Sequence, residues 1–179
     1  MYKLFYIMGA SGVGKDSLMN YARTIIDGAH MVQFAHRYIT RPAHVGNENH
    51  ISLTEKEFEA RKTLQLFAMH WNSHDQQYGI GIEINTWMKN GGKVVINGSR
   101  EYLATAQSLY PQLIPILITA TPDIILQRLI SRNREDAATI QKRFDRNKYI
   151  TTNTQGCILL ENNNALEDAG NRLAQLIIE

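Results

Sequence analysis

Short, uniformly apolar runs recur along the chain, and stretches with helical periodicity separate them. The first run covers residues 4–8 and ends at Gly9, and similar runs cover residues 94–96, 116–118 and 158–160. Runs of this length and composition are typical of strands that are buried on both faces. The sequence therefore predicts a parallel sheet at the centre of the protein.

The stretches between these runs predict helices. Apolar residues recur at helical spacing over residues 15–26. Thr121 and Pro122 are typical of the first residues of a helix, and Asn164 with Glu167 resembles a capping box ahead of another. Strands that alternate with helices in this way predict a three-layer α/β/α fold with a mostly parallel sheet.

Two longer stretches interrupt this alternation. Residues 36–92 are polar, aromatic and rich in histidine, and residues 128–149 are rich in arginine. We expect a single domain whose core comprises residues 1–35, 93–127 and 150–179. The first stretch is then an insertion over the carboxyl edge of the sheet, where open α/β sheets bind ligands.

Composition and charge exclude several classes of protein. A length of 179 residues suits one domain, and a formal net charge of +2 is too small to favour nucleic acid as the main partner. The longest apolar stretches are too short to span a bilayer, and the single cysteine, Cys157, favours a reducing compartment. We therefore expect a soluble, cytoplasmic protein that binds neither nucleic acid nor membrane. Its oligomeric state stays open, with a homodimer as one alternative.

A phosphate-binding loop directly follows the first apolar run. Its G-x-x-x-x-G-K motif is formed by Gly9, Ala10, Ser11, Gly12, Val13, Gly14 and Lys15. The glycines let successive backbone N–H groups point at phosphate oxygens, and the N-terminus of the next helix adds positive charge. Lys15 can reach the β- and γ-phosphates of a nucleotide. The motif predicts a nucleotide site, and we expect ATP as the nucleotide.

The two residues after this motif depart from its usual pattern. Asp16 stands where a serine or threonine hydroxyl usually binds Mg²⁺, and Ser17 comes one residue later. A carboxylate is also a hard oxygen ligand that can hold Mg²⁺ directly or through water. Alternatively, Asp16 only caps the helix. We include both residues in the predicted ATP-binding segment and treat both as candidate Mg²⁺ ligands.

Beyond this loop, several segments resemble the guanylate kinase family, in order and along nearly the whole chain. They are Tyr38-Ile39-Thr40-Arg41-Pro42, residues 53–58, Tyr78-Gly79, residues 92–98, and the arginine-bearing stretch from Arg128 to Phe144. The resemblance implies a P-loop kinase fold in which the insertion binds the phosphate acceptor and residues 128–149 form a lid. Where that family reads guanine, this chain has His70 and Ile80. Because unmatched polar groups strongly penalise binding, these replacements argue against GMP as the substrate.

More narrowly, the chain resembles the ribose 1,5-bisphosphate phosphokinases of phosphonate catabolism. The likeness is carried by residues 14–17, 36–41, 48–51, 78–84 and 95–100. It implies transfer of the γ-phosphoryl group of ATP to the 1-phosphate of ribose 1,5-bisphosphate, with 5-phospho-α-D-ribose 1-diphosphate as the product. The alternatives are a nucleoside monophosphate kinase with altered base recognition and a non-catalytic guanylate-kinase-like module that binds proteins. The intact glycine-lysine loop disfavours the module.

Phosphoryl transfer depends on positioning and charge, so cationic residues are the first candidates for the site. We expect Lys15 to act on the donor, and Arg132 and Arg143 to clamp the transferred group from the lid. The alternative for each lid arginine is a solvated helix charge. The expected acceptor-binding residues are Arg37, Arg41, His50, Tyr78, Asn97, Ser99 and Arg100.

His50 and Tyr78 each have a competing interpretation, which for His50 is a surface or packing role. Tyr78 can be a core aromatic residue instead. Asn97 replaces the acidic residue that often ends this strand, which weakens any assignment of a carboxylate–Mg²⁺ contact there.

Overall fold

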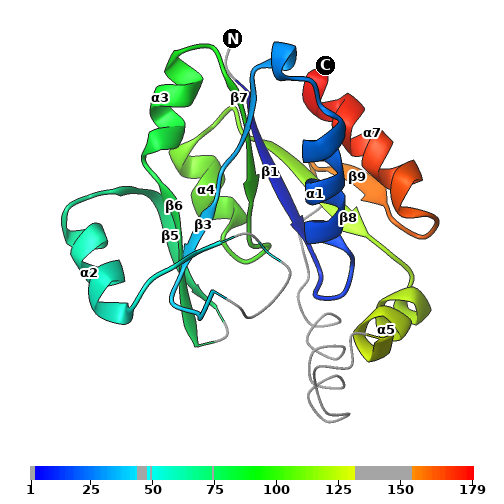
Figure 1. Ribbon diagram of the computed structural model, residues 1–179, viewed down its shortest axis with the longest axis horizontal. Coiled ribbons are helices and arrows are strands. Elements are labelled where there is room, and N and C mark those ends of the chain that lie inside the picture. Colours follow the sequence, from blue (N-terminus) through cyan, green and yellow to red (C-terminus); the bar gives the residue numbers. More distant parts are fainter. Residues whose placement is uncertain (1–2, 44–47, 49, 74, 132–154) are drawn as a thin grey trace.

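The central sheet consists of five parallel strands in the order β2-β7-β1-β8-β9 (Figure 1). The structure is a computed structural model that describes residues 3–43, 48, 50–73, 75–131 and 155–179. The strands are β1 (Lys3–Gly9), β2 (Val32–Phe34), β7 (Lys93–Asn97), β8 (Ile114–Thr119) and β9 (Ile158–Glu161). The four apolar runs of the sequence lie in β1, β7, β8 and β9. The predicted parallel sheet is therefore confirmed.

Helices cover both faces of this sheet, which makes the predicted three layers. These helices are α1 (Lys15–Ile25), α3 (Glu83–Lys89), α4 (Leu103–Leu109) and α7 (Leu166–Ile178). Phe5 and Ile7 of β1 are buried in an apolar cluster with residues of α1 and α7, whereas Leu4, Tyr6 and Met8 point to the opposite face and pack with residues of α3 and α4. In Figure 1, α1 and α7 lie side by side on the same side of the sheet, in agreement with their contacts.

The helix starts are partly as predicted. The helix α5 (Pro122–Ser131) begins at the predicted proline, and a short 3₁₀ turn (Gly28–His30) follows α1. The capping box predicted from Asn164 and Glu167 is wrong, because the N-cap of α7 is Ala165 and makes no side-chain hydrogen bond. The backbone is still extended at Ala165, with ψ of 151°, so the helix starts one residue too late for the two side chains to reciprocate.

The stretch 36–92 folds mainly into a second, four-stranded sheet of order β4-β3-β6-β5. Its strands β3 and β4 are parallel, whereas β6 pairs antiparallel with both β3 and β5. Ile39, Met69 and Ile80 of this sheet are buried in the same cluster as Leu4 of β1, so the two sheets share one core. The elements are β3 (Arg37–Ile39), β4 (Ile51–Ser52), α2 (Glu55–Thr63), β5 (Phe67–Ser73) and β6 (Gln76–Gly81).

Strand ends bring the candidate residues together. Gly9 ends β1 and begins the phosphate loop, and Asn97 ends the neighbouring strand β7, where it pairs in register with Ile7. Arg41 follows β3 two residues after its end, in the second sheet. The site therefore lies where the central sheet and the second sheet meet. No helix among the described residues is both long enough and apolar enough to cross a membrane.

Candidate active site

The phosphate loop has the backbone that its glycines predict. Gly12 and Gly14 have φ angles of 86° and 90°, which residues other than glycine rarely adopt. A Cβ atom at Gly14 would also lie 2.5 Å from the side-chain nitrogen of Asn162. The loop ends at Gly14, the N-cap of α1, so that the first turn of α1 opens onto the site. This is the arrangement in which backbone N–H groups and a helix N-terminus bind phosphate.

Two residues from distant parts of the chain hold this loop in place. The side-chain amide of Asn162 donates a 2.8 Å hydrogen bond to the carbonyl oxygen of Val13, and Nη1 of Arg128 donates to the same oxygen at 3.2 Å. Arg128 also donates to the backbone carbonyl of Asn162 at 2.9 Å. The resemblance assigns Arg128 to the lid, but the structure places it in α5, bound to the loop. Asn162 thus contacts the phosphate loop, although no sequence motif assigns it a role.

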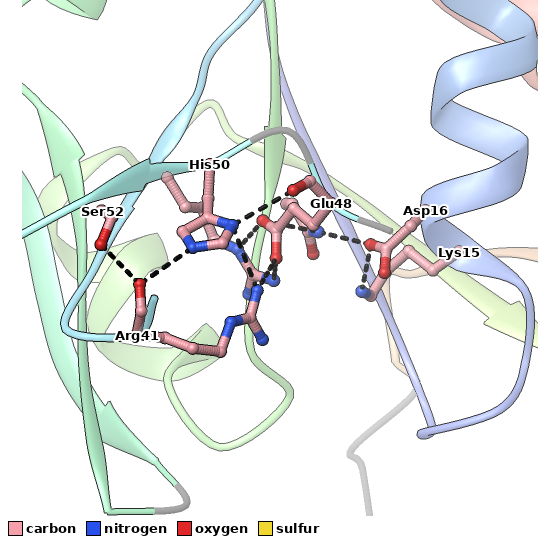
Figure 2. A network of polar contacts seen from close by, with 8 residues as sticks. Lys15, Asp16, Arg41, Glu48, His50 and Ser52 are labelled. Carbon is pink, nitrogen blue, oxygen red and sulfur yellow. Dashed lines mark hydrogen bonds and ion pairs between the residues drawn. The ribbon is translucent and has the colours of Figure 1, made fainter. Parts of the chain in front are cut away.

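Lys15 and Asp16 stand side by side in the first turn of α1 (Figure 2). The ammonium group of Lys15 lies 3.5 Å from Oδ1 of Asp16. The N-cap of α1 is Gly14, which has no side-chain cap hydrogen bond, so the alternative role of Asp16 as a helix cap is not what the structure shows. The positive charge of Lys15 lowers the pKa of the Asp16 carboxyl, against the opposing effect of burial, so this group is ionised at neutral pH. Ser17 is exposed on the same helix.

Asn97 links this carboxylate to the second sheet. Its side-chain nitrogen donates to Oδ1 of Asp16 at 2.9 Å and to Oε1 of Glu48 at 3.4 Å. Asn97 is only 4% exposed, and its side-chain oxygen is buried without a partner among the described residues. The amide group thus stands between two carboxylates, with its hydrogens toward them.

Glu48 gathers the arginines of the acceptor side. Its carboxylate accepts two hydrogen bonds from the guanidinium fork of Arg37, and Nη2 of Arg41 approaches the same carboxylate at 3.4 Å. Glu48 is the main residue of this network to which the sequence gives no role. The available signal is its position within the E-N-H segment that carries the narrower resemblance, close in sequence to Arg41.

His50 and Ser52 fix the backbone that carries Arg41 (Figure 2). The Ser52 hydroxyl donates to the carbonyl oxygen of Arg41 at 2.7 Å, and Nε2 of His50 lies 3.2 Å from the same oxygen. Nδ1 of His50 lies 3.1 Å from the carbonyl oxygen of Glu48 and 3.3 Å from Nη2 of Arg41. The predicted acceptor residue His50 therefore positions Arg41 in this structure, from a buried place with 8% exposure.

Arg41 is the cation of this group whose donors are least satisfied. Its Nε atom is buried and has no hydrogen-bond partner among the described residues, and its Nη2 contacts are 3.3 and 3.4 Å long. By contrast, the guanidinium group of Arg37 donates two hydrogen bonds to the carboxylate of Glu48. An arginine with unused donors beside a phosphate loop is suited to bind an anionic ligand.

The remaining predicted acceptor residues lie around this network. Tyr78 is buried and stacks on Trp71 with ring centroids 5.7 Å apart, and the guanidinium carbon of Arg37 lies over the Tyr78 ring, 5.0 Å from its centroid. Tyr6 accepts from the backbone N–H of Ser99 at 2.9 Å and donates to its carbonyl oxygen at 2.8 Å. Ser99 and Arg100 are half-buried after the end of β7. Tyr78 therefore supports the wall of the site, and Ser99 is held at its edge by the core.

The predicted lid residues Arg132 and Arg143 lie outside the described residues. Among the described residues, no group of three or more His, Cys, Asp or Glu side chains is arranged to hold a metal ion. Asp16 is nevertheless a suitable Mg²⁺ ligand, because it is ionised, partly exposed and adjacent to the phosphate loop. The arrangement as a whole places the cationic side chains of Lys15 and Arg41 at the two ends of a polar network through Asp16, Asn97 and Glu48.

Comparison with known proteins identifies relatives of this chain. No family model matches the chain. The "Ribose 1,5-bisphosphate phosphokinase PhnN" of Thiobacillus denitrificans is 49% identical over 175 residues, which are 98% of this chain and 92% of that protein. Proteins of the same name from Psychromonas ingrahamii and Desulfomicrobium baculatum are each 47% identical, over 98% and 100% of this chain and 89% and 96% of theirs.

The fold is also that of a solved structure. The crystal structure of guanylate kinase from Anaplasma phagocytophilum matches with a TM-score of 0.69 and 12% identity, over 97% of this chain and 83% of that one. The P-loop α/β fold predicted from the sequence is thereby confirmed. With 47–49% identity over nearly the full length of its relatives, the chain belongs to the family of ribose 1,5-bisphosphate phosphokinases.

Proposed function

We propose that this protein transfers the γ-phosphoryl group of ATP to the 1-phosphate of ribose 1,5-bisphosphate and forms 5-phospho-α-D-ribose 1-diphosphate. The observation that carries this proposal is the continuous polar network between the phosphate loop and Arg41. It runs from Lys15 through Asp16, Asn97 and Glu48 to the arginine. Transfer from ATP to an acceptor phosphate requires the donor and acceptor phosphates to meet, and this network joins Lys15 at the phosphate loop to Arg41 within one site.

The residues fit an acceptor that is itself a phosphate. In the reaction, an oxygen of the acceptor phosphate forms a bond to the γ-phosphorus while the bond between that phosphorus and the β–γ bridging oxygen breaks, and ADP leaves with the bond's electron pair. A phosphate dianion needs no base to become a nucleophile, so positioning and charge stabilisation suffice. Lys15 and the backbone N–H groups of the phosphate loop hold the donor phosphates, and Arg41 orients the acceptor phosphate.

Mg²⁺ is the expected cofactor, and Asp16 is the residue that would hold it, with Ser17 as the other candidate. When bound with ATP, Mg²⁺ supplies charge neutralisation between the phosphates. The lid arginines Arg132 and Arg143 complete the proposal as cations that neutralise charge on the transferred group. Closure over the substrates would also exclude water, which otherwise competes as acceptor.

An ADP-release assay with three acceptors offered separately tests this function. With ATP and Mg²⁺, we expect turnover on ribose 1,5-bisphosphate, and formation of the 1-diphosphate product by mass spectrometry. GMP and AMP should give turnover near the background rate, because the guanine-reading positions carry His70 and Ile80. Turnover on GMP but not on the bisphosphate would identify a nucleotide kinase, and no turnover with any acceptor would favour a binding module.

A further inference from the structure

Asp16 and Asn97 stand at two positions where P-loop enzymes usually have a different pair of residues. A hydroxyl residue commonly follows the lysine of the loop, and a carboxylate commonly ends the neighbouring strand; the two together hold Mg²⁺. In this chain the carboxylate follows Lys15, and an amide ends β7. Relative to the common pattern, the carboxylate and the neutral hydrogen-bonding group have exchanged places.

The geometry places the two replacements in direct contact. The Asn97 amide donates to the Asp16 carboxylate at 2.9 Å, although the residues are 81 positions apart. The same nitrogen is 3.4 Å from the carboxylate of Glu48. An aspartate at position 97 would bring a third carboxylate into this group, next to the carboxylates of Asp16 and Glu48, where like charges repel. The amide is therefore suited to this position because the carboxylate is already present at position 16.

Asn97 is also placed firmly enough to orient its partner. It is 4% exposed and pairs with Ile7 in the register of the central sheet. Its side-chain oxygen is buried and has no partner among the described residues, which leaves one oxygen acceptor beside Asp16 for a further hydrogen-bond donor. Asp16, by contrast, has 31% of its side chain exposed and can be reached by a ligand.

We propose that Asp16 and Asn97 are an exchanged pair, in which Asp16 supplies the carboxylate for the nucleotide-bound divalent cation and Asn97 is the positioning residue that fixes this carboxylate. This inference rests on the proposed function only in taking the nucleotide to be bound at the phosphate loop. It accounts for the unusual aspartate after Lys15 and for the missing acidic residue at the end of β7 by a single change of arrangement.

The test returns the pair to the common order. The full-length variants are Asp16→Thr, Asp16→Asn, Asn97→Ala and the double variant Asp16→Thr with Asn97→Asp; Asp168→Thr, on the exposed side of α7, is the matched control. The unfolding midpoint temperature is measured once with ATP and a chelator and once with ATP and Mg²⁺. The readout is the rise from the first value to the second, which is the Mg²⁺-dependent increment. A ligand that binds only the folded state raises this midpoint, so the difference reports the cation site without any acceptor.

We expect the Mg²⁺-dependent increment in the wild type and in the Asp168 control. It should disappear in Asp16→Thr and Asp16→Asn, fall by at least half in Asn97→Ala, and return to at least half of its wild-type size in the double variant. The nucleotide-free midpoint shows that each variant folds. Retention of the increment in both Asp16 single variants, or its absence from the double variant, would overturn the exchanged pair.

Phosphoryl transfer is measured in parallel as an independent readout. We expect the double variant to transfer phosphate to ribose 1,5-bisphosphate at least tenfold faster than Asp16→Thr, and an equally slow double variant contradicts the pair. If the wild type shows the Asp16-dependent increment but no transfer to the bisphosphate, the proposed function fails and the exchanged pair stands. If transfer occurs and the increment is independent of Asp16, the exchanged pair fails and the function stands.

Discussion

At the scale of single residues, Arg37 and Arg41 have the same side chain but different roles. The side chains of Arg37 and Glu48 are only 12% and 10% exposed, and they form a bidentate pair. Burial alone would lower the pKa of the Arg37 guanidinium, but the hydrogen bonds and charge of Glu48, with the charge of Asp16, raise it overall. In this structure Arg37 is thus fully engaged with Glu48, whereas Nε of Arg41 has no hydrogen-bond partner among the described residues.

The first prediction concerns Arg41. Replacement of Arg41 by alanine should raise the KM for the bisphosphate about 10- to 100-fold, because hydrogen bonds to a charged phosphate are lost, while the KM for ATP changes little. Steady-state kinetics with each substrate varied in turn measures both values. Arg172→Ala, an exposed arginine of α7, is the control. An unchanged acceptor KM in Arg41→Ala would place the acceptor site elsewhere.

The second prediction concerns the buried ion pair. Glu48→Ala should lower the free energy of unfolding by about 3–5 kcal/mol, since the charge of Arg37 is left buried without a partner. Urea unfolding followed by circular dichroism measures the change. Lys62→Ala removes an ion pair of Lys62 with Glu59 on the exposed side of α2 and should have little effect. Equal effects of the two substitutions are incompatible with a special role for the Arg37–Glu48 pair.

At the scale of secondary-structure elements, the end of β7 is tied to β1 by one side chain. Tyr6 is fully buried, and its hydroxyl makes two hydrogen bonds with the backbone of Ser99. The chain can pass this close because residue 98 is glycine: a Cβ atom there would lie 2.1 Å from the Tyr6 ring. The core of the central sheet therefore fixes the segment that carries Asn97 and Ser99.

The third prediction follows from this contact. Tyr6→Phe should cost about 1–3 kcal/mol of stability, because the N–H of Ser99 loses its partner and the carbonyl of Ser99 keeps only the 3.3 Å hydrogen bond from the N–H of Tyr102. Burial raises the pKa of the Tyr6 hydroxyl, so the folded state retains this proton while the unfolded chain loses it. Its contribution is fully present below the unfolded pKa of about 10 and is lost as the pH rises above that value.

Unfolding by urea at several pH values from 7 to 11 checks both parts of this prediction. The wild type should lose stability more steeply above pH 10 than Tyr6→Phe. Parallel pH profiles for the two proteins would contradict the assignment of this alkaline loss to Tyr6. Tyr21→Phe, which removes a hydroxyl bonded to Asn171 at the surface, is the control.

At the scale of the whole molecule, the two sheets are parts of one core. Trp71 of the second sheet stacks on Tyr102, which immediately precedes α4 of the central layers, with ring centroids 5.3 Å apart. The cluster that holds Trp71 also contains Leu4 and Val94 of the central strands. The site between the sheets is therefore built on one packed body rather than on two loosely joined parts.

The fourth prediction tests this shared core. Because the two sheets bury their apolar residues against each other, they should unfold in one cooperative transition. Tryptophan fluorescence, which reports on Trp71 and Trp87, and far-ultraviolet circular dichroism should give coincident urea curves. Two separate transitions would show that the second sheet unfolds independently of the central one.

Several features of the protein follow from the sequence by itself. The apolar runs identify four of the five central strands, and the G-x-x-x-x-G-K motif identifies the loop and the start of α1, because these signals depend on neighbouring residues. The family and its fold were also predictable, since they rest on ordered motifs along the whole chain. The cap of α7 was mispredicted by one residue, because backbone conformation at Ala165 rather than side-chain type decides it.

Only the tertiary structure determined which polar residues of the site contact one another. Asn162 lies 149 positions from the Val13 carbonyl that it holds, and Asn97 lies 81 positions from Asp16. Glu48, which has no motif of its own, becomes the centre of the acceptor side because β3 and the end of β7 bring Arg37 and Asn97 to it. A polar residue's partner depends on which strand ends meet in space, and no local pattern of side chains records that.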